Sequence, residues 1–204
     1  MNIYLFLMMR TRDENKELAI RQQAMEMVVK EGLDGLTMQR LAKKAGVSPA
    51  TIYIYFKDRD DLVLKICTKV TNDMLEFTIR NFDADMHFEE GLKIQWENRA
   101  AYCMKFPLEM EFIEHVRFSY LYARVRETQT STFGEVMGKF MNNAIKRKEL
   151  IKLPFEVYWS VAFAPLYQLI KFHLQERSFV NEHFTLSKDV MMKAFRMVIK
   201  ALTP

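Results

Sequence analysis

The feature that most constrains this chain is a turn between two short amphipathic segments, within residues 36–59 (LTMQRLAKKAGVSPATIYIYFKDR). Gly46 favours the left-handed conformation that ends a helix. Ser48 followed by Pro49 indicates a new helix, because serine is a good N-cap and proline is tolerated at the first helical position. Upstream, Thr37 is a second N-cap residue. The pattern predicts two short helices that meet at a tight turn.

The apolar residues of both helices are spaced so that the helices can pack together. Leu41 and Ala45 lie one turn apart on the first helix, and Ile52 and Phe56 do so on the second. Val47 follows the turn, where it can fold back on this seam. Helices that pack in this way form a helix-turn-helix, whose second helix fits the major groove of DNA. An ordinary helical hairpin without a DNA role is the alternative.

The excess positive charge of the chain lies in the same segment. Residues 36–59 contain five Lys or Arg side chains and one Asp, and the resulting net charge of +4 equals that of the whole chain. The other residues are therefore balanced, and the excess lies where phosphates would be met. A solvated charged face is the usual explanation of such a run, but here it coincides with the predicted motif.

The run "T-x-x-x-L-A-x-x-A-G-V-S", followed by "T-I-Y-x-Y-F-K", resembles the DNA-binding domain of the TetR family of bacterial repressors, over residues 19–64. The resemblance implies a homodimer on a nearly palindromic double-stranded DNA operator. At Ile54 the chain departs from the polar or aromatic residue that is common there. The implied DNA contacts are Thr37, Gln39, Ser48, Pro49, Ala50, Thr51, Tyr53, Tyr55, Lys57 and Arg59.

We expect an all-α chain, because only 6 Gly and 5 Pro are present and no short alternating segments occur. A helix at residues 12–31, with a stripe of Leu18, Ala19, Met25, Val28 and Val29, should back the two motif helices. A further helix, capped by Asp58, should run to about Phe82 as a connecting rod. With the resemblance, this predicts a DNA-binding domain at residues 10–57 and an effector-binding and dimerisation domain at residues 58–204.

The second domain should hold the larger apolar core, since 13 of the 16 phenylalanines and both tryptophans lie from Phe82 onward. Helices are expected at residues 88–105, 107–127, 128–148, 155–176 and 187–202. The resemblance implies that the last two pair with their copies in a four-helix bundle. It also implies a small-molecule effector, and plain core packing is an equally good interpretation of each pocket candidate. These candidates are Trp96, Tyr102, Phe112, His115, Phe118, Tyr122, Trp159, Phe163 and Tyr167.

The expected function is a ligand-responsive transcriptional regulator, a repressor that a small and largely apolar molecule releases from DNA. The alternative is a helical small-molecule-binding protein or enzyme with an incidental helix-turn-helix. No clustered catalytic set, phosphate-binding Gly loop or HExxH occurs, so we expect neither an enzyme nor a cofactor. Glu111 and His115 lie one turn apart, but two ligands do not make a metal site. Cys67 and Cys103, the only cysteines, fit a cytoplasmic setting with free thiols.

Residues 1–9, MNIYLFLMM, are apolar but too short for a membrane span, which needs about 20 residues. They also lack the basic start and the small-residue cleavage site of a secretory signal. We interpret them as an upstream extension, with Met8 or Met9 as the natural beginning. An ordered arm that packs on the body is the alternative.

Overall fold

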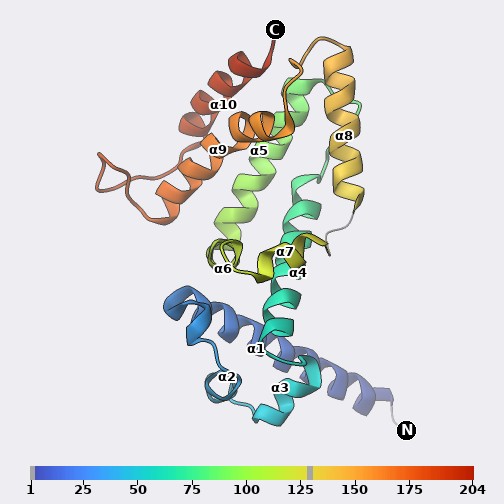
Figure 1. Ribbon diagram of the computed structural model, residues 1–204, viewed down its shortest axis with the longest axis vertical. Coiled ribbons are helices and arrows are strands. Elements are labelled where there is room, and N and C mark those ends of the chain that lie inside the picture. The colour runs from blue at the N-terminus through green and yellow to red at the C-terminus, as the bar shows by residue number, and fades with distance from the viewer. Residues whose placement is uncertain (1–2, 128–130) are drawn as a thin grey trace. The chain divides into compact units, whose positions relative to one another are not determined.

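The computed structural model describes the backbone of residues 3–127 and 131–204, and the side chains of residues 14–125 and 133–204. Within these ranges the chain forms ten α-helices and no strand, which confirms the all-α prediction (Figure 1). None of the helices in the described part is long and apolar enough to cross a membrane. The packing of residues 1–9 lies outside the described side chains.

The chain divides into two compact units. Unit 1 comprises Met1–Asn72 and Leu108–Gln129, and unit 2 comprises Asp73–Pro107 and Thr130–Pro204. The chain therefore passes from one unit to the other within the fourth helix and returns near Pro107. The division at residues 57 and 58 stays a prediction.

Unit 1 contains the predicted motif and the helices that support it. Its elements are α1 (Ile3–Gly35), α2 (Met38–Ala45), α3 (Pro49–Tyr55), the first part of α4 (Arg59–Thr78), most of α6 (Pro107–Arg117) and α7 (Leu121–Glu127). The helical path of α1 breaks at Gly32, whose φ of 73° lies in the left-handed region that favours glycine. α1 packs against both α2 and α3.

The stripe expected on α1 is wrong in part. Leu18 is 59% exposed, whereas Ile20 and Ala24 are completely buried in the core of unit 1. Apolar residues occur on more than one side of this helix, so its spacing alone allows two similar stripes. The contacts of α2 and α3 decide which of them is buried.

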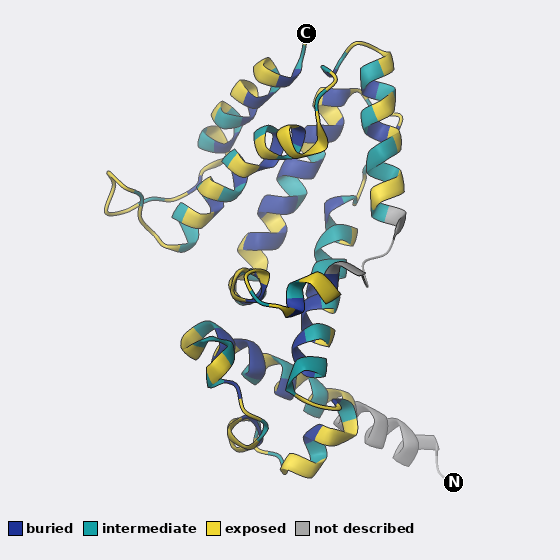
Figure 2. Cartoon of the chain, in the orientation of Figure 1, coloured by how far each residue is buried: buried dark blue, intermediate teal, exposed yellow. Residues whose placement is uncertain are grey.

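Unit 2 is built around α5 (Phe88–Lys105), which packs against α8 (Ser131–Lys146) and α9 (Phe155–Leu174). α9 also packs against α10 (Lys188–Leu202). Buried residues run along most of α5 (Figure 2). The helices expected at residues 88–105, 155–176 and 187–202 are confirmed, and α9 continues through Pro165.

Two predicted helix boundaries are wrong. The single helix expected at residues 107–127 is divided into α6 and α7 by Ser119, whose hydroxyl donates to the carbonyl of Val116 (2.7 Å) and accepts the N–H of Leu121 (3.3 Å). The connecting helix α4 ends at Thr78, before Asn81, which adopts a positive φ of 56°. Asparagine is one of the few residues that tolerate this conformation. The expected helix start at residue 128 lies outside the described residues.

The N-terminus of α5 is capped from a distant segment. His87 occupies the cap position but makes no side-chain capping bond, and Oε2 of Glu149 accepts the N–H of Phe88 at 2.9 Å instead. Arg147 binds both oxygens of the same carboxylate, and Nδ1 of His87 lies 2.6 Å from Oε1. These contacts, with Arg147 contributing most, lower the pKa of Glu149 to about 2.

Candidate nucleic-acid interface

The two motif helices are fixed by the predicted caps. Oγ1 of Thr37 accepts the N–H of Arg40 at 3.3 Å and begins α2. Gly46 ends this helix with a φ of 66° and donates its N–H to the carbonyl of Ala42. Oγ of Ser48 accepts the N–H of Thr51 at 3.1 Å and begins α3. The turn between the helices is therefore set by local hydrogen bonds, as predicted.

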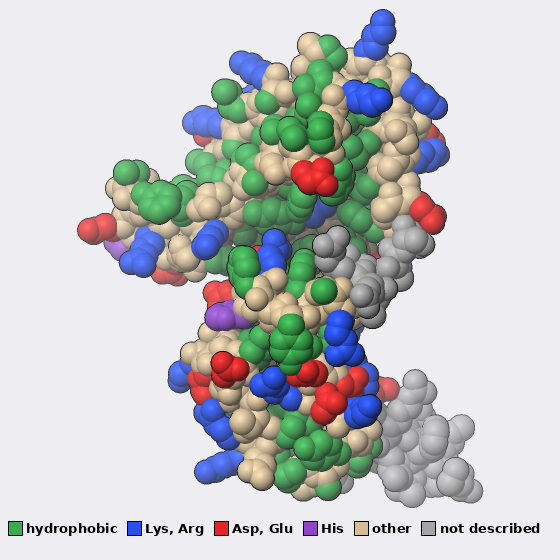
Figure 3. Space-filling view, in the orientation of Figure 1, with side chains coloured by type: hydrophobic (Ala, Val, Ile, Leu, Met, Phe, Trp, Pro, Cys, Tyr) green, Lys and Arg blue, Asp and Glu red, His purple; other side chains and the backbone are tan. Residues whose placement is uncertain are grey.

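The inner face of α3 is buried and its outer face is open. Ile52 and Phe56 are 0% and 1% exposed, which confirms the predicted seam with Leu41. Tyr53 and Ile54 are 54% and 77% exposed. Hydrophobic side chains gather at the surface over α3 (Figure 3). A large apolar residue such as Ile54 gains nothing from exposure to water, so this face is suited to contact with another molecule.

Most of the predicted DNA-contact residues are exposed, but three are partly buried. The exposed ones are Thr37, Gln39, Ser48, Pro49, Ala50, Tyr53 and Lys57. Thr51 is half-buried, with its hydroxyl 2.9 Å from that of Ser48. Tyr55 packs against the core of unit 1, with its ring 6.3 Å from that of Phe56. The DNA contacts themselves stay predictions.

Arg59, the third partly buried residue, is held by its neighbours. Its guanidinium donates to Oδ1 of Asp60 and to Oη of Tyr120, both at 3.4 Å. The Tyr120 hydroxyl in turn donates to Asp60 at 2.6 Å. The bonds to Tyr120 and Asp60 raise the pKa of Arg59. A phosphate contact by Arg59 would have to compete with these partners.

The positive charge of the motif is partly compensated by a carboxylate outside it. Glu31 of α1 accepts from Arg40 and from Lys44, with 3.3 Å to Nζ of Lys44. The hydrogen bond from Arg40, followed by that from Lys44, lowers the pKa of Glu31. Lys43 and Lys57 are exposed and form no ion pair within the described ranges. These two lysines are the cations of the motif best placed to meet phosphates.

Comparison with known proteins identifies this unit. Residues 20–66 match the model of the N-terminal domain of bacterial regulatory proteins of the tetR family. Residues 20–66 therefore form a DNA-binding domain of the TetR type. The two motif helices, α2 and α3, are therefore the helix-turn-helix of that family. The resemblance on which the DNA contacts were predicted is confirmed.

Relatives with a curated description match part of this chain. An uncharacterised helix-turn-helix transcriptional regulator of Haemophilus influenzae is 35% identical over 72 residues, which are 35% of this chain and 38% of that protein. A fatty acid metabolism regulator protein of Bacillus subtilis is 30% identical over 61 residues, or 30% of this chain and 31% of that protein. The matched part thus spans about a third of each relative.

Solved structures extend the likeness to the whole chain. A TetR-family transcription regulator of Marinobacter aquaeolei has a TM-score of 0.70 at 24% identity, over 95% of this chain and 98% of that one. A TetR-family transcriptional regulator of Haemophilus influenzae has a TM-score of 0.76 at 19% identity, over 94% and 98% of the two chains. These likenesses show that unit 2, like unit 1, has the fold of the family.

The predicted pocket residues are divided between the two units, and their role in binding stays a prediction. Unit 2 holds Trp96, Tyr102, Trp159, Phe163 and Tyr167. Within it, the Trp159 ring lies 4.7 Å from that of Phe163 and 5.8 Å from that of Tyr167. The remaining candidates, Phe112, His115, Phe118 and Tyr122, belong to unit 1, where Phe112 is buried in the core and Phe118 is 89% exposed.

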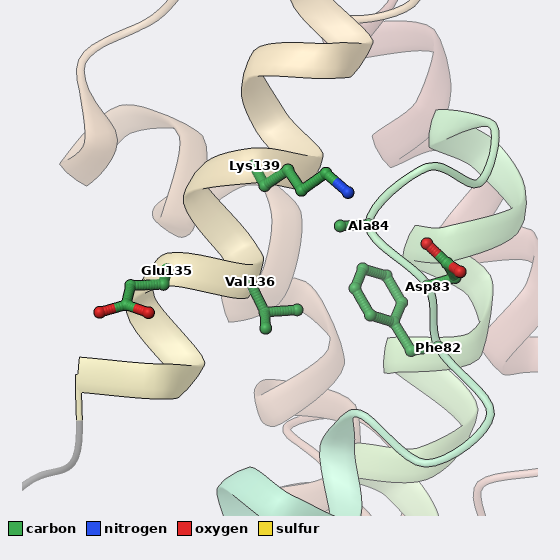
Figure 4. Close-up of a pocket in the computed structure, with 6 residues that line it drawn as sticks. All are labelled: Phe82, Asp83, Ala84, Glu135, Val136 and Lys139. Atoms are coloured by element: carbon green, nitrogen blue, oxygen red, sulfur yellow. The ribbon is translucent and has the colours of Figure 1, made fainter.

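A surface depression of about 380 Å³ lies between α8 and the segment that precedes α5 (Figure 4). It is lined by Phe82, Asp83, Ala84, Glu135, Val136 and Lys139. The two acidic residues and Lys139 are exposed, and Lys139 forms an ion pair with Asp85 at 2.8 Å. A depression with so open a rim does not bury enough of a small molecule to bind it tightly.

Proposed function

We propose that this chain is a transcriptional regulator that inserts α3 into the major groove of DNA. The observation that carries the proposal is the outer face of α3, which exposes Tyr53 and Ile54 on a helix fixed by Ser48 and a buried inner face. A rigid, exposed helix in a TetR-type motif is suited to base contacts, because its side chains need little ordering on binding.

Five exposed residues of the motif have DNA contacts that their chemistry favours. Tyr53 donates to a phosphate oxygen, and Lys43 and Lys57 pair with phosphates. Gln39, at the start of α2, hydrogen-bonds an adenine edge, a contact that discriminates by about 1–3 kcal/mol. Ile54, which the sequence pattern did not select, packs against a thymine methyl group. The exposed apolar side chain at this position is the signal that points to it.

The active form is a homodimer that pairs through α9 and α10. Both helices carry exposed apolar residues, namely Phe155 (60%), Val157 (45%) and Met197 (65%). Val198, one residue further on, is 4% exposed in the single chain. A charge at Val198 would therefore disturb the core of unit 2, so Met197 is the better position at which to test pairing.

The regulator acts as a repressor that a small, largely apolar effector releases from a palindromic operator. α4 begins in unit 1 and ends in unit 2, so it links a binding event in one unit to the other through a continuous helix. An effector can shift this balance only by binding the two states differently. To change occupancy from 99:1 to 1:99 takes roughly 5.5 kcal/mol of differential affinity.

Selection of bound fragments from genomic DNA, followed by gel-shift titration, tests DNA binding. We expect a near-palindromic sequence to be enriched. Tyr53→Ala should weaken binding to every duplex, and Gln39→Ala should chiefly relax the preference at one base pair in each half-site. Lys148→Ala, on the surface of unit 2, is the matched control. Wild-type protein that enriches no duplex would refute the proposal.

Light scattering of Met197→Glu tests the dimer. A buried glutamate on both sides of a two-fold interface should convert the dimer into monomers. Phe118→Glu, which changes an 89% exposed apolar residue of unit 1, should leave the dimer intact. A wild-type chain that is a monomer at all concentrations would contradict the proposed homodimer.

A further inference from the structure

Two polar side chains are buried in the core of unit 2 without complete hydrogen bonding. Gln95 is 0% exposed and Arg99 is 4% exposed, and they lie one turn apart on α5. Both amide atoms of Gln95 and Nε of Arg99 lack a hydrogen-bond partner among the described residues. Because buried polar groups are almost always bonded, these three atoms are available to bond to a ligand or to an ordered water.

Arg99 is also a buried positive charge without an opposite charge. It is the one charged side chain that is buried in the described part of the chain, and no described Asp or Glu forms an ion pair with it. The Cys103 thiol and the Tyr158 hydroxyl near Arg99 supply no negative charge at pH 7, and burial raises the pKa of both still further above it, to about 11 for Cys103. An unpaired buried charge is strongly unfavourable, so an anion bound beside Arg99 would offset the cost of burying it.

The surroundings of Arg99 are aromatic. The centre of its guanidinium lies 4.3 Å from the ring centroid of Phe163 and 5.5 Å from that of Trp159, and Nη1 donates to Oη of Tyr167 at 2.8 Å. The Nε1–H of Trp96 is occupied by the carbonyl of Ala162, at 2.8 Å. Trp159 and Tyr167 are only half-buried, so the guanidinium lies beneath side chains that reach the surface of the unit.

We infer that unit 2 binds a small monocarboxylic acid with an apolar body, whose carboxylate accepts hydrogen bonds from Arg99 and from the Gln95 amide. One guanidinium matches one negative charge, and its planar donors fit the two oxygens of a carboxylate. The aromatic rings of α9 and Trp96 provide the apolar surface for the rest of the molecule. The inference rests on the proposed function, since it names the chemical class of the effector.

Intrinsic tryptophan fluorescence provides a direct test, because the only two tryptophans, Trp96 and Trp159, both lie in unit 2 beside this cluster. We would titrate the full chain with octanoate and with 3-phenylpropionate, and with octanamide as a neutral molecule of the same shape as octanoate. Calorimetry would confirm each affinity. We expect at least one carboxylate to bind at least tenfold more tightly than octanamide.

Two substitutions locate the contact. Arg99→Met, which keeps the length of the side chain but removes its charge, should weaken carboxylate binding by about 10- to 100-fold, as loss of hydrogen bonds to a charged group implies. Arg99→Lys keeps the charge without the paired donors and should give an intermediate affinity. Lys139→Met, at the surface depression, is the matched control and should bind as the wild type does.

The inference is overturned if neither carboxylate binds at millimolar concentration, if octanamide binds as well as octanoate, or if folded Arg99→Met keeps the wild-type affinity. The comparison of octanoate with octanamide uses the wild type alone, so it decides even if Arg99→Met does not fold. If Arg99 instead paired with a carboxylate of a second copy, Arg99→Met would dissociate the dimer and octanoate would not bind. Failure of carboxylate binding with intact duplex binding refutes this inference only, whereas carboxylate binding without duplex binding refutes the proposed function.

Discussion

The outer face of α3 and the buried face of α5 differ in whether their polar groups already have hydrogen-bond partners. On α3 the capping hydroxyl of Ser48 finds its partner within one turn, and the open side chains face solvent. On α5, Gln95 and Arg99 are inside the core with atoms that lack a partner. The first surface is ready for a large partner that comes from outside. The unbonded atoms of Gln95 and Arg99 are available to a molecule small enough to enter unit 2.

The largest expected effect tests the two faces of α3. Ile52→Ala, at a completely buried position, should lower the free energy of unfolding of unit 1 by about 2–5 kcal/mol, because it removes packed methyl groups and leaves a cavity. Ile54→Ala, at a position 77% exposed, should change it by less than about 0.5 kcal/mol. Urea denaturation followed by circular dichroism measures both. Equal losses at the two positions would show that the inner and outer faces are assigned wrongly.

The next effect concerns the unpaired Gln95 amide on α5. Gln95→Leu removes an unpaired buried amide and should raise the free energy of unfolding of unit 2 by about 1–3 kcal/mol without ligand, since the cost of burying the amide disappears. Tryptophan fluorescence during urea denaturation reports on unit 2 alone, because it contains both tryptophans. Gln168→Leu, on the exposed face of α9, is the control. A destabilised Gln95→Leu chain would mean that the amide has partners within the fold.

A third prediction concerns how the stability of unit 2 depends on pH. The pKa of Glu149 is lowered to about 2, so its carboxylate stabilises unit 2 fully above the ordinary pKa near 4.5 and loses this contribution as the pH falls toward 2. Glu149→Gln should be less stable at pH 7 by about 1–2 kcal/mol, allowing for partial solvent screening. Tryptophan-detected melts should show this difference shrinking between about pH 5 and pH 2. A difference that is independent of pH would contradict the capping role of the ionised group.

The smallest effect tests the rigidity of the DNA-facing helix. Ser48→Ala removes the cap of α3 and should cost about 1 kcal/mol of unit 1 stability. Amide hydrogen exchange should then speed up in α3 more than in α5. The control Ser160→Ala removes a hydroxyl that bonds to a carbonyl in the middle of α9, where no cap is lost. Unchanged exchange in α3 would show that the seam with α2, not the cap, orders this helix.

The sequence was most informative where structure is determined by neighbours in the chain. Caps, the Gly46 turn and the Ile52–Phe56 pair depend on residues within a few positions, so their pattern predicted both the geometry and the family. The stripe on α1 was misjudged because a helix with apolar residues on several sides needs a partner to choose its buried face. The break at Ser119 was missed because a single serine hydroxyl turns the chain there, and serine also occurs inside helices.

The sequence by itself determined an all-helical chain with a helix-turn-helix and a separate, aromatic-rich second half, because periodicity, caps and composition are local properties. Only the tertiary structure showed that Glu31 neutralises part of the motif, that Tyr120 holds Arg59, and that Arg99 of α5 lies among rings from α9, more than fifty residues away. Such contacts arise when helices pack, and spacing along a chain does not record which side chains that packing brings together.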